Sequence, residues 1–537
     1  MLYSRIALAL QEISEAPRGR KIDLVADLLT EIESEPEMLC PAVRLLLGEL
    51  WPPWVGRVMG IGPEALMAAL AEVSDQDLHS LRAGCCDMGM VAEAALGQKG
   101  QHSLFGEPLE ALSVYQRLRR ISAMSGKESE QRKNALLRGL LLEASPLEGK
   151  YIARTALRNM HAGIGHTTMI AALSRSLHSD LEKIRSAYSL MPDLGCIAAM
   201  ARGRKLDAVA FQPKVPTRFM LFRRSDPAVP GCFLPKYPGL RVQVHKVRNE
   251  VLIFSSQLRN ITSSLDGISR MLGEIESDFV ADADLIGFRD SGIKIKEICS
   301  QAEMLRYINR RRLSRKCNIY PALLAYDLIS VQGEDICAVP YQDRRKSLLS
   351  ILGEPKAMPF QGISPVREDV LMDQGAVDEL LCRAGAAGAR ALLGRDLLAP
   401  YLPGMVAERD FILRAEHHLA AVIVRSSWGR DKKEKLPARY LVALRSGKEL
   451  VPVGYAWRGL SQRDQQVLSH VLKSLVISED LCGADVNAQV VLKLKIRGAH
   501  KRAEKYIIIE PVIEGFKLNA TIDDADDLER LEKISSQ

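Results

Sequence analysis

Apolar residues recur three and four positions apart along the first 205 residues, the spacing that lays them on one face of an α-helix. Short runs of proline, glycine and serine interrupt this pattern. We therefore expect a helical domain over residues 1–205. Its clearest helical segments are IDLVADLLTEI, EALMAALAEV, NALLRGLLLEA and TMIAALSRSL.

Beyond residue 205 the hydrophobic pattern changes to a period of two, mixed with helical stretches. The segment LRVQVHKVRNEVLIFSS alternates on both sides of a turn at Arg248–Asn249, which predicts a β-hairpin. FVADADLIGF and ALLAYDLISVQGED predict further strands. An α+β domain over residues 206–415 is the expectation.

From residue 416 to residue 537 short alternating strands follow one another closely, with one helical pattern at SQRDQQVLSHVLKSLV. This spacing is typical of a small Greek-key barrel of the OB type, although a β-sandwich fits the periodicity nearly as well. A chain of 537 residues has room for three domains at about 100–200 residues each. The predicted fold class is a multidomain α plus α+β plus β protein.

Composition adds limited information. The 73 basic and 66 acidic residues leave a net charge of +7, which is compatible with a polyanionic partner but does not require one. The ten cysteines form no C-x-x-C pair and no histidines stand at metal-ligand spacing, so we expect a reduced protein with buried thiols. The first residues lack a signal-peptide pattern and no run of about 18 apolar residues occurs, which predicts a cytoplasmic protein that does not enter a membrane. We also expect a monomer.

Several strings, taken in order, resemble the ATP-dependent DNA ligases of archaea and eukaryotes. The N-terminal strings are LLLGELWPPWVGRVMGIG, DMGMVAE, SLFGEPL, LLLEASPLEGKYIAR and MHAGIG. The resemblance implies a helical DNA-binding domain over 1–205, an adenylation (nucleotidyltransferase) domain over 206–415 and an OB-fold domain over 416–537. It also implies nick sealing in which a lysine takes AMP from ATP with the help of Mg²⁺.

The segment FLPKYPGLR resembles the K-x-D-G-x-R motif that carries the nucleophile in this family. Lys236 matches the catalytic lysine, and Gly239 and Arg241 match their positions, with Arg241 as a nucleotide contact. Pro238 stands where the motif has a carboxylate. It removes a charge and a backbone N–H and fixes φ near −65°, so the loop beside the lysine must bend differently.

Four other positions match motif residues by type or by charge. Asp284 stands for the metal-binding glutamate, and Tyr326 for the aromatic residue that stacks on adenine. A tyrosine in an apolar strand is more often a core residue than a stacking platform. Arg395 and Arg414 replace lysines that contact the phosphates.

The remaining motif positions have lost the chemistry that the family uses. Arg390 stands where a second glutamate would bind metal, and two positive unit charges about 4 Å apart already repel by about 4 kcal/mol at an effective dielectric of 20. Ser256, Ile412 and residues 519–522 replace cations. We therefore expect a protein that binds nicked double-stranded DNA with a degraded catalytic centre, and that uses ATP and Mg²⁺ only if it is active.

DNA contacts are expected from cations in family-like strings, although each one alone is more often a solvated charge. The candidates are Lys127, Lys133, Lys150, Arg154, Lys432 and Lys433. The segment Gln101–Phe105 resembles, in shortened form, a sliding-clamp-binding peptide. Two alternatives stay open at this point: an active ligase that works through a Lys236–AMP intermediate, and a non-catalytic partner of a sliding clamp.

Overall fold

A computed structural model describes most of the chain in two compact units. Unit 1 comprises residues 1–221, 239–365 and 398–407, and unit 2 comprises residues 222–238, 366–397 and 408–537. The described residues are 1–57, 59–74, 76–98, 107–126, 129–223, 229–289, 297–309, 318–358, 360–414, 416–428, 437–447, 449–480, 483–502 and 505–536.

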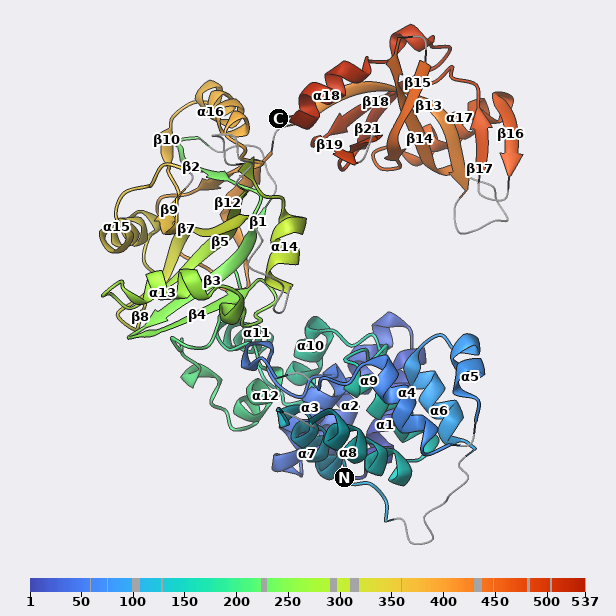
Figure 1. The fold of residues 1–537 in the computed structure, drawn as a ribbon, viewed down its shortest axis with the longest axis vertical. Coiled ribbons are helices and arrows are strands. Elements are labelled where there is room, and N and C mark those ends of the chain that lie inside the picture. The colour runs from blue at the N-terminus through green and yellow to red at the C-terminus, as the bar shows by residue number, and fades with distance from the viewer. Residues whose placement is uncertain are drawn as a thin grey trace. The chain divides into compact units, whose positions relative to one another are not determined.

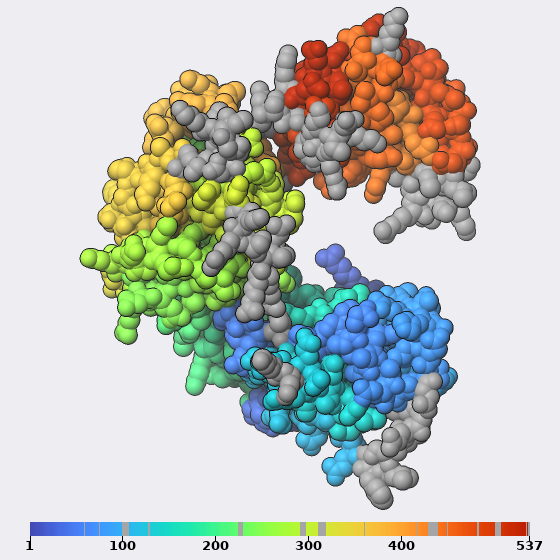
Figure 2. Space-filling model, viewed as in Figure 1, coloured from blue at the N-terminus to red at the C-terminus, as the bar shows by residue number. Residues whose placement is uncertain are grey.

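The N-terminal part of unit 1 is helical, as the hydrophobic spacing predicts (Figure 1). Figure 2 shows its blue and teal atoms as one continuous surface. Its α-helices are α1 (Tyr3–Glu15), α2 (Lys21–Ile32), α3 (Pro36–Leu47), α4 (Pro63–Ala71), α5 (Leu78–Gly84), α6 (Met88–Leu96), α7 (Ala111–Ala123), α8 (Ser129–Glu143), α9 (Pro146–Ala156), α10 (His166–Ser176), α11 (Leu181–Leu190) and α12 (Leu194–Arg202).

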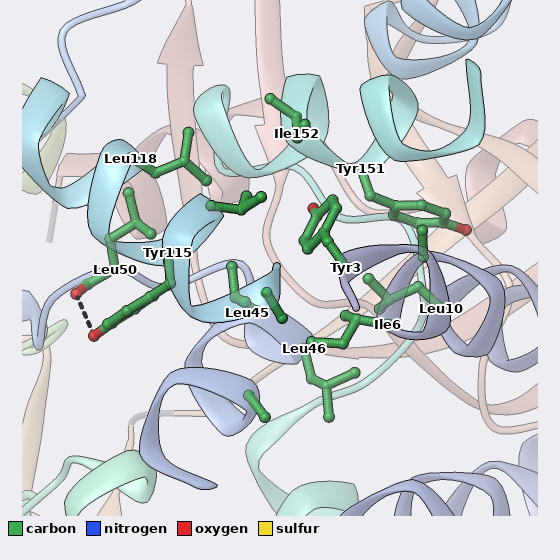
Figure 3. Packing of buried hydrophobic residues seen from close by; sticks show 14 of the residues in the cluster. Tyr3, Ile6, Leu10, Leu45, Leu46, Leu50, Tyr115, Leu118, Tyr151 and Ile152 are labelled. Atoms are coloured by element: carbon green, nitrogen blue, oxygen red, sulfur yellow. Dashed lines mark hydrogen bonds between the residues drawn. The ribbon is translucent and has the colours of Figure 1, made fainter. Parts of the chain in front are cut away.

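One apolar core joins helices that are distant in sequence. Helix α2 packs on α10, α3 on α12 and α6 on α9. Tyr3, Leu10 and Tyr151 are almost fully buried in this core (Figure 3). The Tyr115 hydroxyl, which also lies inside, donates to the Leu50 carbonyl at 3.4 Å, so its polar group is not left unpaired.

Helix α6 begins at an Asp-x-Gly sequence that receives an arginine from another helix. The Asp87 carboxylate caps α6 by accepting the amides of Gly89 and Met90, at 2.7 and 3.3 Å. It also binds Arg154, from the last turn of α9, with Nη2 to Oδ2 at 2.8 Å. An ideal Cβ at Gly89 would lie 2.6 Å from the Arg154 Cγ, so glycine makes room for the guanidinium.

Helix α12 begins with the same arrangement. Asp193 accepts the amides of Gly195 and Cys196, and Arg44 from the last turn of α3 binds it with Nη2 to Oδ2 at 2.5 Å. The Arg44 Nη1 also donates to the Tyr115 hydroxyl at 2.7 Å. A Cβ at Gly195 would lie 3.0 Å from the Arg44 Cγ. Both charged pairs therefore tie the end of one helix to the start of another.

The remainder of unit 1 is built on a seven-stranded sheet with the order β4-β3-β5-β7-β8, in which β6 pairs with β5 and β9 pairs with β7. The predicted hairpin is confirmed: Val247 pairs with Glu250, and Arg248 takes the positive φ of 53° that a tight turn requires. The elements are β3 (Leu240–Val247), β4 (Glu250–Ser255), α13 (Asp266–Gly273), β5 (Phe279–Arg289), β6 (Glu297–Ile298), α14 (Gln301–Asn309), β7 (Ile319–Val331), β8 (Glu334–Asp335), α15 (Tyr341–Leu352) and β9 (Gly362–Pro365).

A smaller sheet with the order β1-β12-β11-β2-β10 belongs mainly to unit 2. Phe233, Leu392 and Phe411 form its core with one helix, α16. The elements are β1 (Leu221–Arg223), β2 (Gly231–Lys236), β10 (Asp369–Leu371), α16 (Gln374–Ala386), β11 (Ala391–Arg395) and β12 (Val406–Leu413).

The C-terminal part of unit 2 is a curled antiparallel sheet, a half-barrel of the OB-like kind that the strand spacing predicts. Strand β13 pairs with β14 on one side and with β18 and then β17 on the other. The elements are β13 (His417–Trp428), β14 (Pro437–Ser446), β15 (Glu449–Ala456), α17 (Gln462–Ser474), β16 (Val476–Asp480), β17 (Gly483–Val486), β18 (Val491–Ile496), β19 (Ala499–Arg502), β20 (Lys505–Ile508), β21 (Val512–Lys517) and α18 (Leu528–Ser536).

Each region has its own apolar core. One core draws on residues 3–198, another on residues 240–363 and a third on residues 419–534. The predicted boundaries of the three domains stay a prediction. Among the described residues, none of the helices combines the length and apolar character needed to cross a bilayer.

The expectation of buried thiols is wrong for part of the set. Among the described cysteines, Cys86 and Cys382 are exposed. Cys86 precedes the first turn of α6, and Cys382 lies off the α16 face that buries Val377, Leu380 and Ala384. Neither position is covered by a neighbouring element, and hydrophobicity alone does not bury a thiol at a helix end or on an exposed face.

Candidate functional site

The six residues that the sequence assigns to nucleotide chemistry are divided between the two units. Arg241, Asp284 and Tyr326 belong to unit 1, on β3, β5 and β7. Lys236, Arg395 and Arg414 belong to unit 2, at the ends of β2, β11 and β12.

Arg241 is held by a buried carboxylate on the neighbouring strand. Its Nε lies 3.0 Å from Asp282 Oδ1 and its Nη2 lies 2.5 Å from Asp282 Oδ2. Its Nη1 donates to the Met220 carbonyl at 2.7 Å, and the Tyr401 hydroxyl donates to Asp282 Oδ2 at 2.9 Å. Burial opposes the charge of the guanidinium, but Asp282 more than offsets this, so the pKa of Arg241 lies above its usual value.

Asp284 and Tyr326 lie on adjacent strands of the same sheet. Asp284 pairs with Arg241 across β3 and β5 and with Leu324 across β5 and β7. Asp284 is 2 % exposed and Tyr326 is 4 % exposed. The roles of Asp284 in metal binding and of Tyr326 in adenine stacking stay predictions.

Asp327, the residue after Tyr326, takes part in a second buried ion pair that the sequence analysis missed. Arg344 on α15 binds it with Nε to Oδ1 at 2.8 Å and Nη2 to Oδ2 at 2.7 Å. Both side chains are at most 1 % exposed. Helical spacing contains a signal for this pair, because Arg344 stands three residues after Tyr341 and four before Leu348, on the apolar face of α15.

Three cations gather at one end of the small sheet. Strand register pairs Lys236 with Ala391, and the amide of Arg390 donates to the Lys236 carbonyl at 2.8 Å. Leu392 pairs with Leu413 on the other side of β11, so Arg414 comes next to the same end. Arg390 is exposed, and Arg414 lies 3.9 Å from Glu510. The sheet therefore brings together Lys236, Arg390 and Arg414.

Arg395 lies at the opposite end of this sheet. It pairs with Cys232 across β11 and β2, four residues along from Ala391, which is about 13 Å at the usual strand rise. Its Nε lies 2.8 Å from Asp410 Oδ2, and both side chains are at most 1 % exposed. A phosphate bound at Lys236 would therefore lie far from the Arg395 backbone. The Arg395 guanidinium is already paired with Asp410.

Of the two positions that the resemblance assigns to metal ligands, one keeps a carboxylate, Asp284, and the other carries Arg390. Within the described ranges, no group of three or more His, Cys, Asp or Glu side chains could hold a metal ion. At the end of β2, Lys236 lies near Arg390 and Arg414, and Arg390 stands at the position that the resemblance gives to a second metal-binding glutamate. A dication at that place would meet like charge.

The cations assigned to DNA in the helical region are buried and bound to protein groups. Lys133 donates to the Met59 carbonyl at 2.9 Å, Lys150 pairs with Glu93 at 2.7 Å, and Arg154 pairs with Asp87. A phosphate would have to compete with these partners, and the assignment of the three residues as DNA contacts stays a prediction. The other assigned positions lie outside the described residues: Lys127, Lys432, Lys433 and the segment Gln101–Phe105.

Two models of one family match the chain. The model described as "DNA ligase N terminus" matches residues 2–174, and the model described as "ATP dependent DNA ligase domain" matches residues 230–380. Together they match more than half of the chain.

Curated relatives match the chain along almost its whole length. A DNA ligase of Methanothermobacter thermautotrophicus is 27 % identical over 99 % of this chain and 98 % of that protein. A DNA ligase of Thermococcus onnurineus is 27 % identical over 96 % of this chain and 94 % of that protein. Among solved structures, "Pmar-Lig_PreS3" covers 95 % of this chain and 99 % of that chain at 12 % identity, with a TM-score of 0.49.

Proposed function

We propose a function from one premise, which is that the chain belongs to the ATP-dependent DNA ligase family. The protein binds nicked duplex DNA in replication or repair and does not carry out adenylyl transfer at an appreciable rate. The observation that carries this proposal is the set of cations at one end of the small sheet, where Arg390 stands beside Lys236 in the place of a metal-binding carboxylate.

Such a set of cations favours phosphate binding over metal-assisted chemistry. A phosphodiester is an anion, and Lys236, Arg390 and Arg414 supply guanidinium and ammonium donors for it. Adenylyl transfer instead requires a triphosphate whose charge is shared with a metal ion, and in that reaction the metal neutralises the developing charge. Phosphodiester binding needs only cations such as these, whereas adenylyl transfer also needs the metal ion.

The buried ion pairs support the same conclusion from the other motif positions. Arg241 is bound to Asp282, and Arg395 is bound to Asp410. Freeing either guanidinium for a nucleotide phosphate would leave a carboxylate buried without its partner, which typically costs about 3–5 kcal/mol. These two arginines therefore serve the fold in this proposal.

DNA binding is tested by titrating the full chain against a nicked duplex and an intact duplex of the same sequence at several salt concentrations. We expect tighter binding of the nicked duplex and an affinity that falls steeply with salt, because phosphate contacts release counterions. Equal affinity for the two duplexes would contradict the nick preference, and no complex with either duplex at low salt would contradict DNA binding altogether.

The contribution of Arg390 is tested by charge reversal. Arg390→Glu introduces an anion beside Lys236, and we expect nicked-duplex affinity to fall about tenfold or more at low salt. Arg383→Glu is the matched control, because Arg383 belongs to α16 of the same unit and its side chain is 62 % exposed. Equal losses of nicked-duplex affinity in both variants would indicate a general effect of charge. They would contradict a specific role of Arg390 in DNA binding.

The second candidate is an active ligase, and the presence of Lys236 at the motif position is the observation in its favour. Incubation with α-labelled ATP and either Mg²⁺ or Mn²⁺, followed by a denaturing gel, distinguishes the two. We expect no labelled band. A band on the native chain that disappears in Lys236→Ala but persists in Lys346→Ala would establish the Lys236–AMP intermediate instead.

A third candidate is a non-catalytic partner of a sliding clamp, which rests on the Gln101–Phe105 segment alone. Pull-down with purified clamp, with Phe105→Ala as the comparison, tests it independently. Clamp binding that Phe105→Ala abolishes, together with no preference for nicked DNA, would favour this candidate over the first.

A further inference from the structure

Two cysteines that are 156 positions apart in the chain meet where α12 packs on α3. Cys40 lies on α3 and Cys196 lies in the first turn of α12, and each thiol shifts the pKa of the other. An ideal Cβ at Gly195 would lie 2.9 Å from the Cys40 sulfur, so this glycine gives the sulfur its place against α12.

The charged groups around the pair make the two thiols unequal. Arg44 Nη2 lies 3.7 Å from the Cys196 sulfur, and Arg44 is itself bound to Asp193. The Cys196 thiol and the charge of Arg44 lower the pKa of Cys40. The Cys40 thiol, burial and the charge of Asp193 raise the pKa of Cys196. Cys40 is therefore the better nucleophile, and Cys196 holds the proton.

From this geometry we propose that Cys40 and Cys196 form a reversible redox site, in which a hydroperoxide converts the two thiols into a disulfide that joins α3 to α12. Both cysteines are partly exposed, so a small oxidant has access. Disulfides that form in reducing compartments are usually of this transient, redox-sensing type. The site is independent of the proposed binding of DNA.

The reaction balances with hydrogen peroxide as the oxidant. The Cys40 thiolate attacks one peroxide oxygen, the O–O bond breaks, and the released hydroxide takes a proton to become water. Cys40 is then a sulfenic acid, and Cys196, as its thiolate, attacks that sulfur and displaces hydroxide as a second water. Two thiols lose two electrons and two protons, and one peroxide becomes two waters. A dithiol reductant reverses the change.

The bond would add a covalent link beside the Arg44–Asp193 ion pair. It closes a loop between residues 40 and 196, and cross-links of long loops restrict the unfolded chain most. The oxidised protein is expected to unfold at a temperature several degrees above the reduced protein. This shift is a readout that needs neither DNA nor nucleotide.

The test uses the reduced full chain and increasing concentrations of hydrogen peroxide. Alkylation of remaining thiols and non-reducing peptide mapping should recover the Cys40–Cys196 cross-link at a peroxide concentration that leaves Cys86 and Cys382 as thiols, and dithiothreitol should remove it. Oxidation of Cys86 or Cys382 before any cross-link forms would overturn the proposal. Recovery of Cys40 as sulfinic acid in the native chain would overturn it as well.

Variants separate the order of steps from the stability of the fold. In Cys196→Ala we expect Cys40 to stop at the sulfenic acid, which dimedone traps, and the thermal shift on oxidation to disappear. Cys382→Ser is the matched control and should keep both the cross-link and the shift. No dimedone adduct on Cys40 in a folded Cys196→Ala variant, as judged by an unchanged circular dichroism spectrum, would contradict Cys40 as the attacking thiol.

Discussion

The helical region and the central sheet of unit 1 bury their charges in different places. In the helical region, Arg44 and Arg154 stand in the last turns of helices, and each binds an aspartate that caps another helix. In the sheet, Asp282 and Asp327 stand within long buried strands and bind Arg241 and Arg344.

The two kinds of ion pair differ in how strongly the buried carboxylate depends on its arginine. A carboxylate at a helix start also accepts backbone amides, so the arginine adds to a cap that already has partners. A carboxylate in the middle of a buried strand depends on its arginine for charge compensation. The strands β5 and β7 thus carry aspartates close in sequence to Asp284 and Tyr326, and these aspartates are bound to Arg241 of β3 and to Arg344 of α15.

Removing Arg344 should give the largest effect, because it leaves Asp327 buried without its partner. Arg344→Ala is expected to lower the free energy of unfolding by about 3–5 kcal/mol, measured by urea denaturation. The double change Arg344→Met with Asp327→Leu should recover most of this loss.

The neighbouring pair on the same helix provides the control for Arg344. Lys346 binds Asp343 at 2.8 Å, and its side chain is 76 % exposed. Lys346→Ala should leave the denaturation midpoint almost unchanged, since exposed pairs contribute little. If Lys346→Ala and Arg344→Ala had similar effects, the distinction drawn for strand pairs would fail.

His245, a fully buried residue of β3, should make the stability of the sheet depend on pH. Its Nδ1 donates to the Pro213 carbonyl at 2.5 Å, and burial lowers its pKa from 6.5 to about 4. The unfolded chain therefore binds a proton first, and stability falls as pH decreases from about 6.5 to 4, by about 3 kcal/mol in total.

The pH effect of His245 is measured as the difference in unfolding free energy between native chain and His245→Gln across this pH range. We expect the difference to shrink as the pH falls. His418→Gln, which alters a histidine whose side chain is 63 % exposed, should give a curve parallel to that of the native chain. A parallel curve for His245→Gln would show that this ring does not control the pH response.

The smallest of the three effects is expected at the helix-end pairs. Gly89→Ala places a Cβ 2.6 Å from the Arg154 Cγ, and the guanidinium must shift away from Asp87. We expect a loss of about 1–3 kcal/mol in thermal or urea unfolding. Gly97→Ala, at the other end of α6, would meet its nearest atom at 3.4 Å and should cost little. Equal effects would remove the packing role assigned to Asp87–Gly89.

Periodicity was sufficient to predict which parts of the chain are helix and which are strand. The hairpin at Arg248–Asn249 and the helix at α17 follow from local patterns, because neighbouring residues decide them. The Asp-x-Gly helix starts were not predicted. Their aspartates bind arginines that stand 67 and 149 positions away in the chain, and no local pattern identifies such partners.

The candidate site was less predictable for the same reason. Motif resemblance assigned Arg241 and Arg395 to nucleotide phosphates, but which anion binds a guanidinium depends on the strands that lie beside it. Asp282 and Asp410 reach these arginines only through strand pairing and packing. Sequence could name the cations, and only the three-dimensional arrangement could identify their partners.

The burial of β5 should slow the exchange of its backbone amide protons with the solvent. Ten of its eleven residues are buried, and β3 and β7 pair with it on both sides. Its amide protons can reach deuterium only when the sheet opens as a whole, so their exchange should report the rarest motions of unit 1. The exchange rates of the Asp282 and Asp284 amides would then measure how often this sheet unfolds.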